Sequence, residues 1–158
     1  MLADAKGGNP MRITLEVDDA VRMLDYLNRE GKRLCAKEIS KGTGVSVRFA
    51  LKILRKLCAA QIVRSYKGSE GGYELNHAPK EISLLDIVEA VNGKISLTKC
   101  VATEVCTKYG NDTALCKFHH LYSDLSESIR QKLDGISLDQ ISDTGQTIVS
   151  QPEESECK

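Results

Sequence analysis

Three cysteines and a histidine lie close together in the second half of the chain. They follow the pattern Cys-x5-Cys-x9-Cys-x2-His and are Cys100, Cys106, Cys116 and His119. Zinc and iron–sulfur clusters need several soft, deprotonated ligands of this kind converging on one point. The spacing is not the paired CxxC of a zinc ribbon. It favours metal or cluster binding over the alternative that these cysteines are ordinary buried side chains.

The predicted secondary structure indicates how these ligands would meet. Apolar residues repeat at helical spacing over 113–133, so Cys116 and His119, three residues apart, would share one helix face. Cys100 and Cys106 lie in a segment predicted to be irregular over 94–113, which would fold over that face.

The remaining cysteines and the neighbouring histidine have simpler interpretations. Cys35 and Cys58 fall within the segment predicted to form a helix-turn-helix and are expected to be small buried side chains. Cys157 lies in a polar tail and is expected to be an exposed thiol. His120 is the alternative to His119 as a ligand.

The segment before the cysteines has the element order of a winged helix-turn-helix. Apolar periodicity predicts helices over 15–28, 36–41 and 47–59, with two glycines forming the turn between the second and the third. Two strand-like runs over 62–67 and 72–76 flank a glycine-containing tip and predict a β-hairpin, the wing. The fold class predicted for the chain is therefore mainly α, with a small hairpin wing and a long C-terminal helix.

The helix over 47–59 is the predicted DNA-reading helix, because the turn before it would project its first turns toward base edges. Its core-facing stripe is predicted to comprise Ala50, Leu51, Leu54 and Leu57. Arg48 would pair with guanine, and Lys52 or Arg55 with phosphate. The alternative is that these charges form a solvated helix face. The residues expected to contact DNA, including two at the wing, are Ser46, Arg48, Phe49, Lys52, Arg55, Lys67 and Gly68.

A capped helix over 83–92 closes the DNA-binding domain, with Ser83 and Asp86 as a capping-box pair. The apolar stripe of the long helix would pack on its own domain or on a second copy, and a short helix is predicted over 138–141. The expected division of the chain is a disordered extension (1–10), the DNA-binding domain (11–93), a cysteine-rich loop (94–112), the long and short helices (113–143) and a disordered acidic tail (144–158).

Charge and composition narrow the function classes. Residues 11–75 carry 13 lysines and arginines against 8 acids, whereas residues 134–158 carry one lysine against 6 acids. A basic half is compatible with nucleic acid. No apolar run is long enough for a membrane helix and no signal peptide precedes Met11, so a cytoplasmic location without membrane contact is expected. No catalytic motif is present, so an enzyme is the least favoured class.

Several segments together resemble the Rrf-type family of bacterial winged-helix iron–sulfur transcription regulators. They are MRIT (11–14), AKEISKGTGVSVRFALKILRKLCAAQIV (36–63), KGSEGGYEL (67–75), APKEISLLDIVEAVNG (78–93) and ISLDQI (136–141). The resemblance implies a homodimer formed through the long helix and a palindromic double-stranded DNA operator. It also implies that Cys100, Cys106 and Cys116 hold a 2Fe–2S or 4Fe–4S cluster, with zinc less favoured, and that the protein senses redox state, nitric oxide or iron–sulfur status.

The resemblance leaves the fourth ligand open. In the IscR-like branch the fourth ligand is a histidine that follows the third cysteine, as His119 does here. In the NsrR-like branch the fourth ligand is an N-terminal aspartate of the other subunit, and Asp18 matches that place. The sequence departs from the family in the long gap before Cys116 and in having Lys67 where arginine is usual. The alternatives are a cluster-free regulator that uses thiols, a small ligand or a partner protein, and a zinc-stabilised protein-interaction module.

Overall fold

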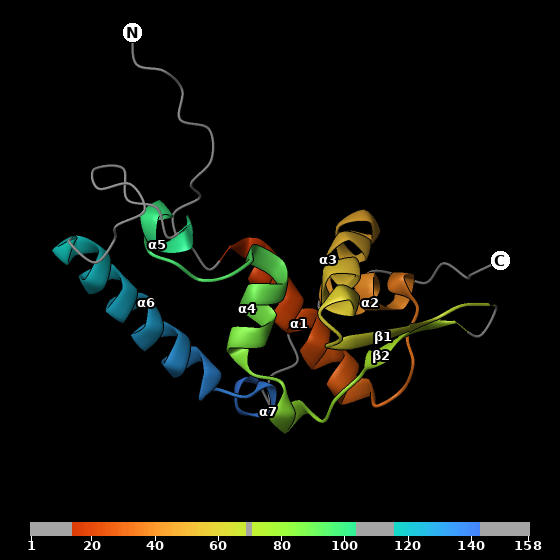
Figure 1. Cartoon of the computed structure of the whole chain (residues 1–158). Coiled ribbons are helices and arrows are strands. Elements are labelled where there is room, and N and C mark those ends of the chain that lie inside the picture. Colours follow the sequence, from red (N-terminus) through yellow and green to blue (C-terminus); the bar gives the residue numbers. More distant parts are fainter. Residues whose placement is uncertain (1–13, 69–70, 104–115, 143–158) are drawn as a thin grey trace, which may run out of the picture.

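The computed structural model describes residues 14–68, 71–103 and 116–142 of the 158-residue chain. Helices account for most of the described part, and one hairpin supplies its two strands (Figure 1). No helix among these residues is long and apolar enough to cross a membrane. The elements in chain order are α1 (Leu15–Glu30), α2 (Ala36–Thr43), α3 (Val47–Ala59), β1 (Val63–Tyr66), β2 (Gly72–Leu75), η1 (Pro79–Glu81), α4 (Leu84–Asn92), α5 (Lys99–Thr103), α6 (Lys117–Asp134) and α7 (Leu138–Ile141).

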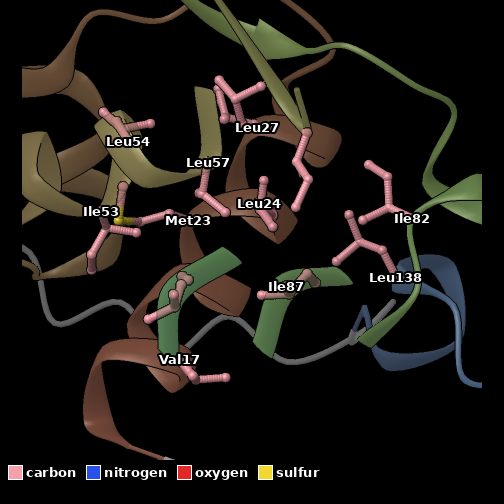
Figure 2. Packing of buried hydrophobic residues seen from close by; sticks show 14 of the residues in the cluster. Val17, Met23, Leu24, Leu27, Ile53, Leu54, Leu57, Ile82, Ile87 and Leu138 are labelled. Atoms are coloured by element: carbon pink, nitrogen blue, oxygen red, sulfur yellow. The ribbon is translucent and has the colours of Figure 1, made fainter. Parts of the chain in front are cut away.

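The hydrophobic core lies between α1, α3 and α4. Figure 2 shows Leu24 of α1, Leu57 of α3 and Ile87 of α4 directed toward one another, and all three are fully buried. Each comes from an apolar stripe at helical spacing, and burying these stripes against one another is what holds three short helices together. The core thereby fixes α3 against two other helices.

The helix α3, which the sequence predicts to read DNA, has the predicted bounds. The Ser46 side chain accepts a hydrogen bond from the Phe49 amide, so Ser46 is the N-cap as expected. The predicted core-facing stripe was wrong at one position. Leu51 is 40% exposed, and Ile53 is buried in its place. The buried face of α3 is therefore rotated away from Leu51, which lies on the outer surface.

The wing is a two-stranded antiparallel hairpin with Tyr66 opposite Gly72. The chain between α1 and α2 adds one further backbone pair, because Leu34 and Tyr73 exchange two hydrogen bonds of 3.0 and 2.8 Å. The guanidinium of Arg33 lies 3.5 Å from the centroid of the Tyr66 ring. These contacts attach the tip end of the two strands to the chain between α1 and α2, so the wing has a defined direction relative to α3.

The C-terminal part differs from the prediction in two places. A short helix, α5, is present in the segment that was predicted to be irregular, and it carries Cys100. Of the predicted long helix, residues 113–115 lie outside the described residues, and α6 begins only at Lys117. Cys116 is its extended N-cap residue, and His119 lies three residues later in the first turn of the helix.

The long helix α6 packs against α4, on the side of the molecule away from the hairpin (Figure 1). Arg130 of α6 forms an ion pair with Glu89 of α4, and the Ser126 hydroxyl accepts a hydrogen bond from the Leu97 amide at 3.1 Å. The chain then returns through α7, whose Leu138 is fully buried in the core. The helix α6 is thus joined to α4 through Arg130 and to the connection between α4 and α5 through Ser126.

Candidate nucleic-acid interface and cysteine segment

The outer surface of α3 carries the cationic side chains that the sequence assigns to DNA. Arg48, Lys52 and Arg55 are all exposed, at positions that lie close together on one side of the helix. Phe49 is half-buried against the core, and its ring centroid lies 5.4 Å from the Lys52 ammonium. The Phe49 ring, near the N-terminus of the helix, therefore packs on the core on one side and lies close to the Lys52 side chain on the other.

An acidic partner of the reading helix was not anticipated from the sequence. Glu16 of α1 lies 3.3 Å from the Lys52 ammonium and 2.8 Å from that of Lys56. Burial of Glu16 raises its pKa, but hydrogen bonds from Lys56 and Lys52 outweigh this, and the pKa is lowered overall. The sequence shows Glu16 only as an acid in a first helical turn, and no local signal indicates a partner 36 residues away.

Lys56 ties α3 to a third helix. Its ammonium donates a 2.7 Å hydrogen bond to the carbonyl of Val91, near the C-terminus of α4. Helix C-termini carry partial negative charge and unpaired carbonyls, so a lysine is well matched to this place. The end of α4 is also joined to the start of α1, where the Thr14 hydroxyl donates a 3.0 Å hydrogen bond to Asn92. The reading helix therefore shares charged contacts with both α1 and α4.

The two wing residues assigned to DNA lie at the end of β1. Lys67 is exposed, and Gly68 has φ +102°, a conformation that strongly favours glycine. Residues 69–70 of the tip lie outside the described residues. Glu74 of β2 forms an ion pair with Arg33 at 3.5 Å and accepts a hydrogen bond from Tyr66, which strengthens the attachment of the strands to the chain between α1 and α2.

The predicted cluster ligands are placed only in part. Cys100 is half-buried, with its Sγ 3.1 Å from the Thr98 hydroxyl oxygen, and Cys116 is half-buried at the start of α6. Cys106 lies outside the described residues. Within residues 14–68, 71–103 and 116–142, no group of three or more His, Cys, Asp or Glu side chains is close enough to hold a metal ion.

One ring nitrogen of His119, the remaining predicted ligand, is buried without a hydrogen-bond partner among the described residues. This nitrogen is Nδ1. His119 lines a hollow of ≈ 530 Å³ between α5 and α6, together with Val101 and Ser123. A buried polar nitrogen without a partner costs about 1–3 kcal/mol, so an occupant that binds it is favoured. Three thiols and this imidazole form a donor set that fits an iron–sulfur cluster.

The other candidate for the fourth ligand, Asp18, lies in the first turn of α1. Its carboxylate accepts a 2.5 Å hydrogen bond from Arg22 one turn later, and both side chains are exposed. The cysteines expected to be buried, Cys35 and Cys58, are half-buried instead. Burial raises the pKa of the Cys58 thiol, with a smaller opposing effect of Ser65, as expected for an unreactive thiol.

Comparison with known proteins identifies the family. The family model Rrf2, described as an iron-dependent transcriptional regulator, matches residues 13–144. The chain belongs to the Rrf2 family. The regulator IscR of Aliivibrio salmonicida is 36% identical over 104 residues, which are 66% of this chain and 60% of that protein. IscR of Pectobacterium carotovorum is 32% identical over 133 residues, covering 83% of this chain and 79% of that protein.

The solved structures agree on the fold. The global cysteine regulator CymR of B. subtilis superposes with a TM-score of 0.65 at 20% identity, over 86% of this chain and 99% of that one. The mainly α fold with a hairpin wing is thereby confirmed. As a member of the Rrf2 family, the protein is a DNA-binding transcription regulator and not an enzyme.

Proposed function

We propose that this Rrf2-family protein is a homodimer that binds a palindromic operator and senses redox state, nitric oxide or iron–sulfur status through an iron–sulfur cluster. The observation that carries the sensing part is the buried, unpartnered Nδ1 of His119 beside a segment with three thiols. The description of the matching family as iron-dependent supports the same assignment. DNA binding itself follows from membership of the family.

For the operator contacts, the exposed cations of α3 and the wing support the roles inferred from the sequence. Arg48 in the first turn pairs with guanine, because a guanidinium matches the O6 and N7 acceptors of that base. Arg55 holds a phosphate and so fixes the register on the duplex, whereas Lys52 is paired with Glu16 and reaches a phosphate only when that ion pair opens. Ser46 and Phe49 position the start of the helix, and Lys67 with Gly68 brings the wing to the DNA backbone or minor groove.

Exposed apolar side chains on α6 support the homodimer. Phe118, Leu121 and Leu125 are large, exposed and spaced three and four residues apart, so they form one stripe. A second copy of α6 is an occupant that would bury the same stripe on both chains, as two-fold symmetry requires. Two reading helices related by that symmetry would meet two half-sites of a palindrome.

The ligand set proposed for the cluster is Cys100, Cys106 and Cys116 with a fourth ligand from His119 or from Asp18 of the second subunit. When bound, a cluster provides a centre whose charge and ligation change on oxidation, loss or reaction with nitric oxide. His119 would be bound through the nitrogen that is now unpartnered, whereas Asp18 would first have to leave Arg22. This comparison favours His119.

The chain also contains contacts that link the ligand region to the reading helix. Arg130 pairs with Glu89 on α4, and Glu89 also accepts a 3.2 Å hydrogen bond from the Ile95 amide in the connection to α5. From α4, the Val91 carbonyl contacts Lys56 on α3. A change in the position of α5 or α6 would thus alter the contacts that hold α3. Regulation requires that the dimer with the cluster and the dimer without it differ in their affinity for the operator.

The test is anaerobic purification followed by visible absorption and analysis of iron, sulfide and zinc. We expect a coloured protein with iron and sulfide, and loss of both in Cys106→Ala but not in the control Cys157→Ala. His119→Ala should destabilise the cluster more than His120→Ala, its neighbour on α6. A colourless, metal-free protein after reconstitution would instead indicate a thiol-based regulator, and one zinc per chain a zinc-stabilised module.

A further inference from the structure

Two aliphatic side chains on the outer face of α3 are exposed where a helical domain ordinarily places polar residues. Val47 is 38% exposed and Leu51 is 40% exposed. They are four residues apart, in the first two turns of the helix, and so lie on one row of its surface. The buried face of the same helix is occupied by Ile53, Leu54 and Leu57, so these two side chains are not needed for the core.

The surroundings of this pair indicate what covers it. Val47 and Leu51 line a shallow hollow with cationic side chains beside them and no acidic residue in the lining. The lining residues are Ser46, Val47, Arg48, Phe49, Leu51, Lys52 and Arg55. The complementary partner is therefore an anion that also presents an apolar group. Duplex DNA is such a partner, because the C5 methyl of thymine projects into the major groove beside the base-edge acceptors.

We propose that Val47 and Leu51 are specificity-determining residues that contact thymine methyl groups in each half-site. The proposal rests on the assignment of α3 as the reading helix and extends it from phosphate and guanine contacts to a second base. Because Leu51 is on the same side of the helix as Arg48 and Arg55, the thymine lies next to the positions that those cations contact. An aliphatic side chain offers no hydrogen bond, so it selects thymine through the methyl group alone.

The experiment first selects a duplex from a random library with the full-length wild-type protein. Each thymine in the selected half-site is then replaced by deoxyuridine, which removes only the methyl group, and affinity is measured by fluorescence anisotropy at fixed salt. We expect at least one replacement to weaken binding about fourfold, equivalent to about 0.8 kcal/mol for one buried methyl. In Leu51→Ala the thymine and deoxyuridine duplexes should bind equally at that position.

Leu15→Ala is the matched control, because Leu15 is an exposed leucine on α1, outside the proposed reading surface. It should keep the wild-type preference for thymine, and both variants should retain the wild-type melting temperature. Equal wild-type affinity for thymine and deoxyuridine at every position would overturn the inference while leaving α3 as the reading helix. If Arg48→Ala also left affinity for the selected duplex unchanged, the assignment of α3 itself would be wrong.

Discussion

Glu16 is expected to restrain the affinity of the reading helix for DNA, and Glu16→Gln tests this directly. The carboxylate pairs with two lysines of α3, Lys52 at 3.3 Å and Lys56 at 2.8 Å. After the substitution Lys56 keeps its hydrogen bond to the Val91 carbonyl. The side chain of Lys52 is the more exposed of the two lysines, at 54% against 34%, so Lys52 is the one that becomes available to a phosphate.

The size of the effect follows from counterion release. One additional phosphate contact steepens the dependence of log Kobs on log salt concentration by about 0.9. Between 50 and 200 mM salt, Glu16→Gln should therefore lose about three- to fourfold more affinity than the wild type loses, starting from tighter binding at low salt. Loss of the partly exposed ion pair should also lower the free energy of unfolding by roughly 1 kcal/mol.

Affinity for one selected duplex should be measured by fluorescence anisotropy across that salt range. Glu127→Gln makes the same change in charge at an exposed position on α6 and should leave the salt slope unaltered. In a Lys52→Ala background, Glu16→Gln should no longer steepen the slope. The reasoning is refuted if the slope of Glu16→Gln equals that of the wild type, or if the steepening persists without Lys52.

Three further predictions concern stability and thiol chemistry. Gly72→Ala should lower the melting temperature by several degrees, because a Cβ there would lie 2.7 Å from the Leu34 carbonyl oxygen, whereas Gly135→Ala meets nothing closer than 3.6 Å and should be tolerated. Leu138→Ala should cost about 2–5 kcal/mol in urea unfolding, since the side chain is fully buried, and a loss below 1 kcal/mol would mean that α7 does not pack on the core. Burial raises the pKa of the Cys58 thiol, so its alkylation should be slow at pH 8 and accelerate only as the pH rises above the ordinary cysteine range, as peptide mapping by mass spectrometry can show.

The reading helix shows what the sequence could predict and where prediction failed. Its bounds and its Ser46 cap follow from local rules, and both were correct. Its buried face did not follow, because apolar residues occur at 51, 53, 54 and 57, and periodicity alone cannot tell a core leucine from one exposed on a binding surface. The misassigned Leu51 is one of the two residues now proposed to contact thymine methyl groups.

The contacts that connect the helices could not be predicted from local sequence patterns. Glu16 and Lys52 are 36 residues apart, and Arg130 and Glu89 are 41 apart, so only the tertiary fold brings them together. The start of α6 was misplaced for a related reason. Residues 113–116 continue an apolar periodicity, but Cys116 is the extended N-cap of the helix in the structure. Residue types alone suggest the donor set proposed for the cysteine segment, whereas the burial of the His119 nitrogen depends on the tertiary fold and could not be predicted from them.

The most direct measurement compares two affinities for one selected duplex at one salt concentration. One is the affinity of the anaerobically purified protein, and the other is that of the same protein after removal of its iron. The account predicts that the two affinities differ at least about fivefold, the lower range of a coupling free energy between two sites. It also predicts that His119→Ala reduces this difference and that His120→Ala does not. Equal affinities of the two forms would contradict the sensing role and leave a DNA-binding regulator whose cysteines do not control it through a cluster.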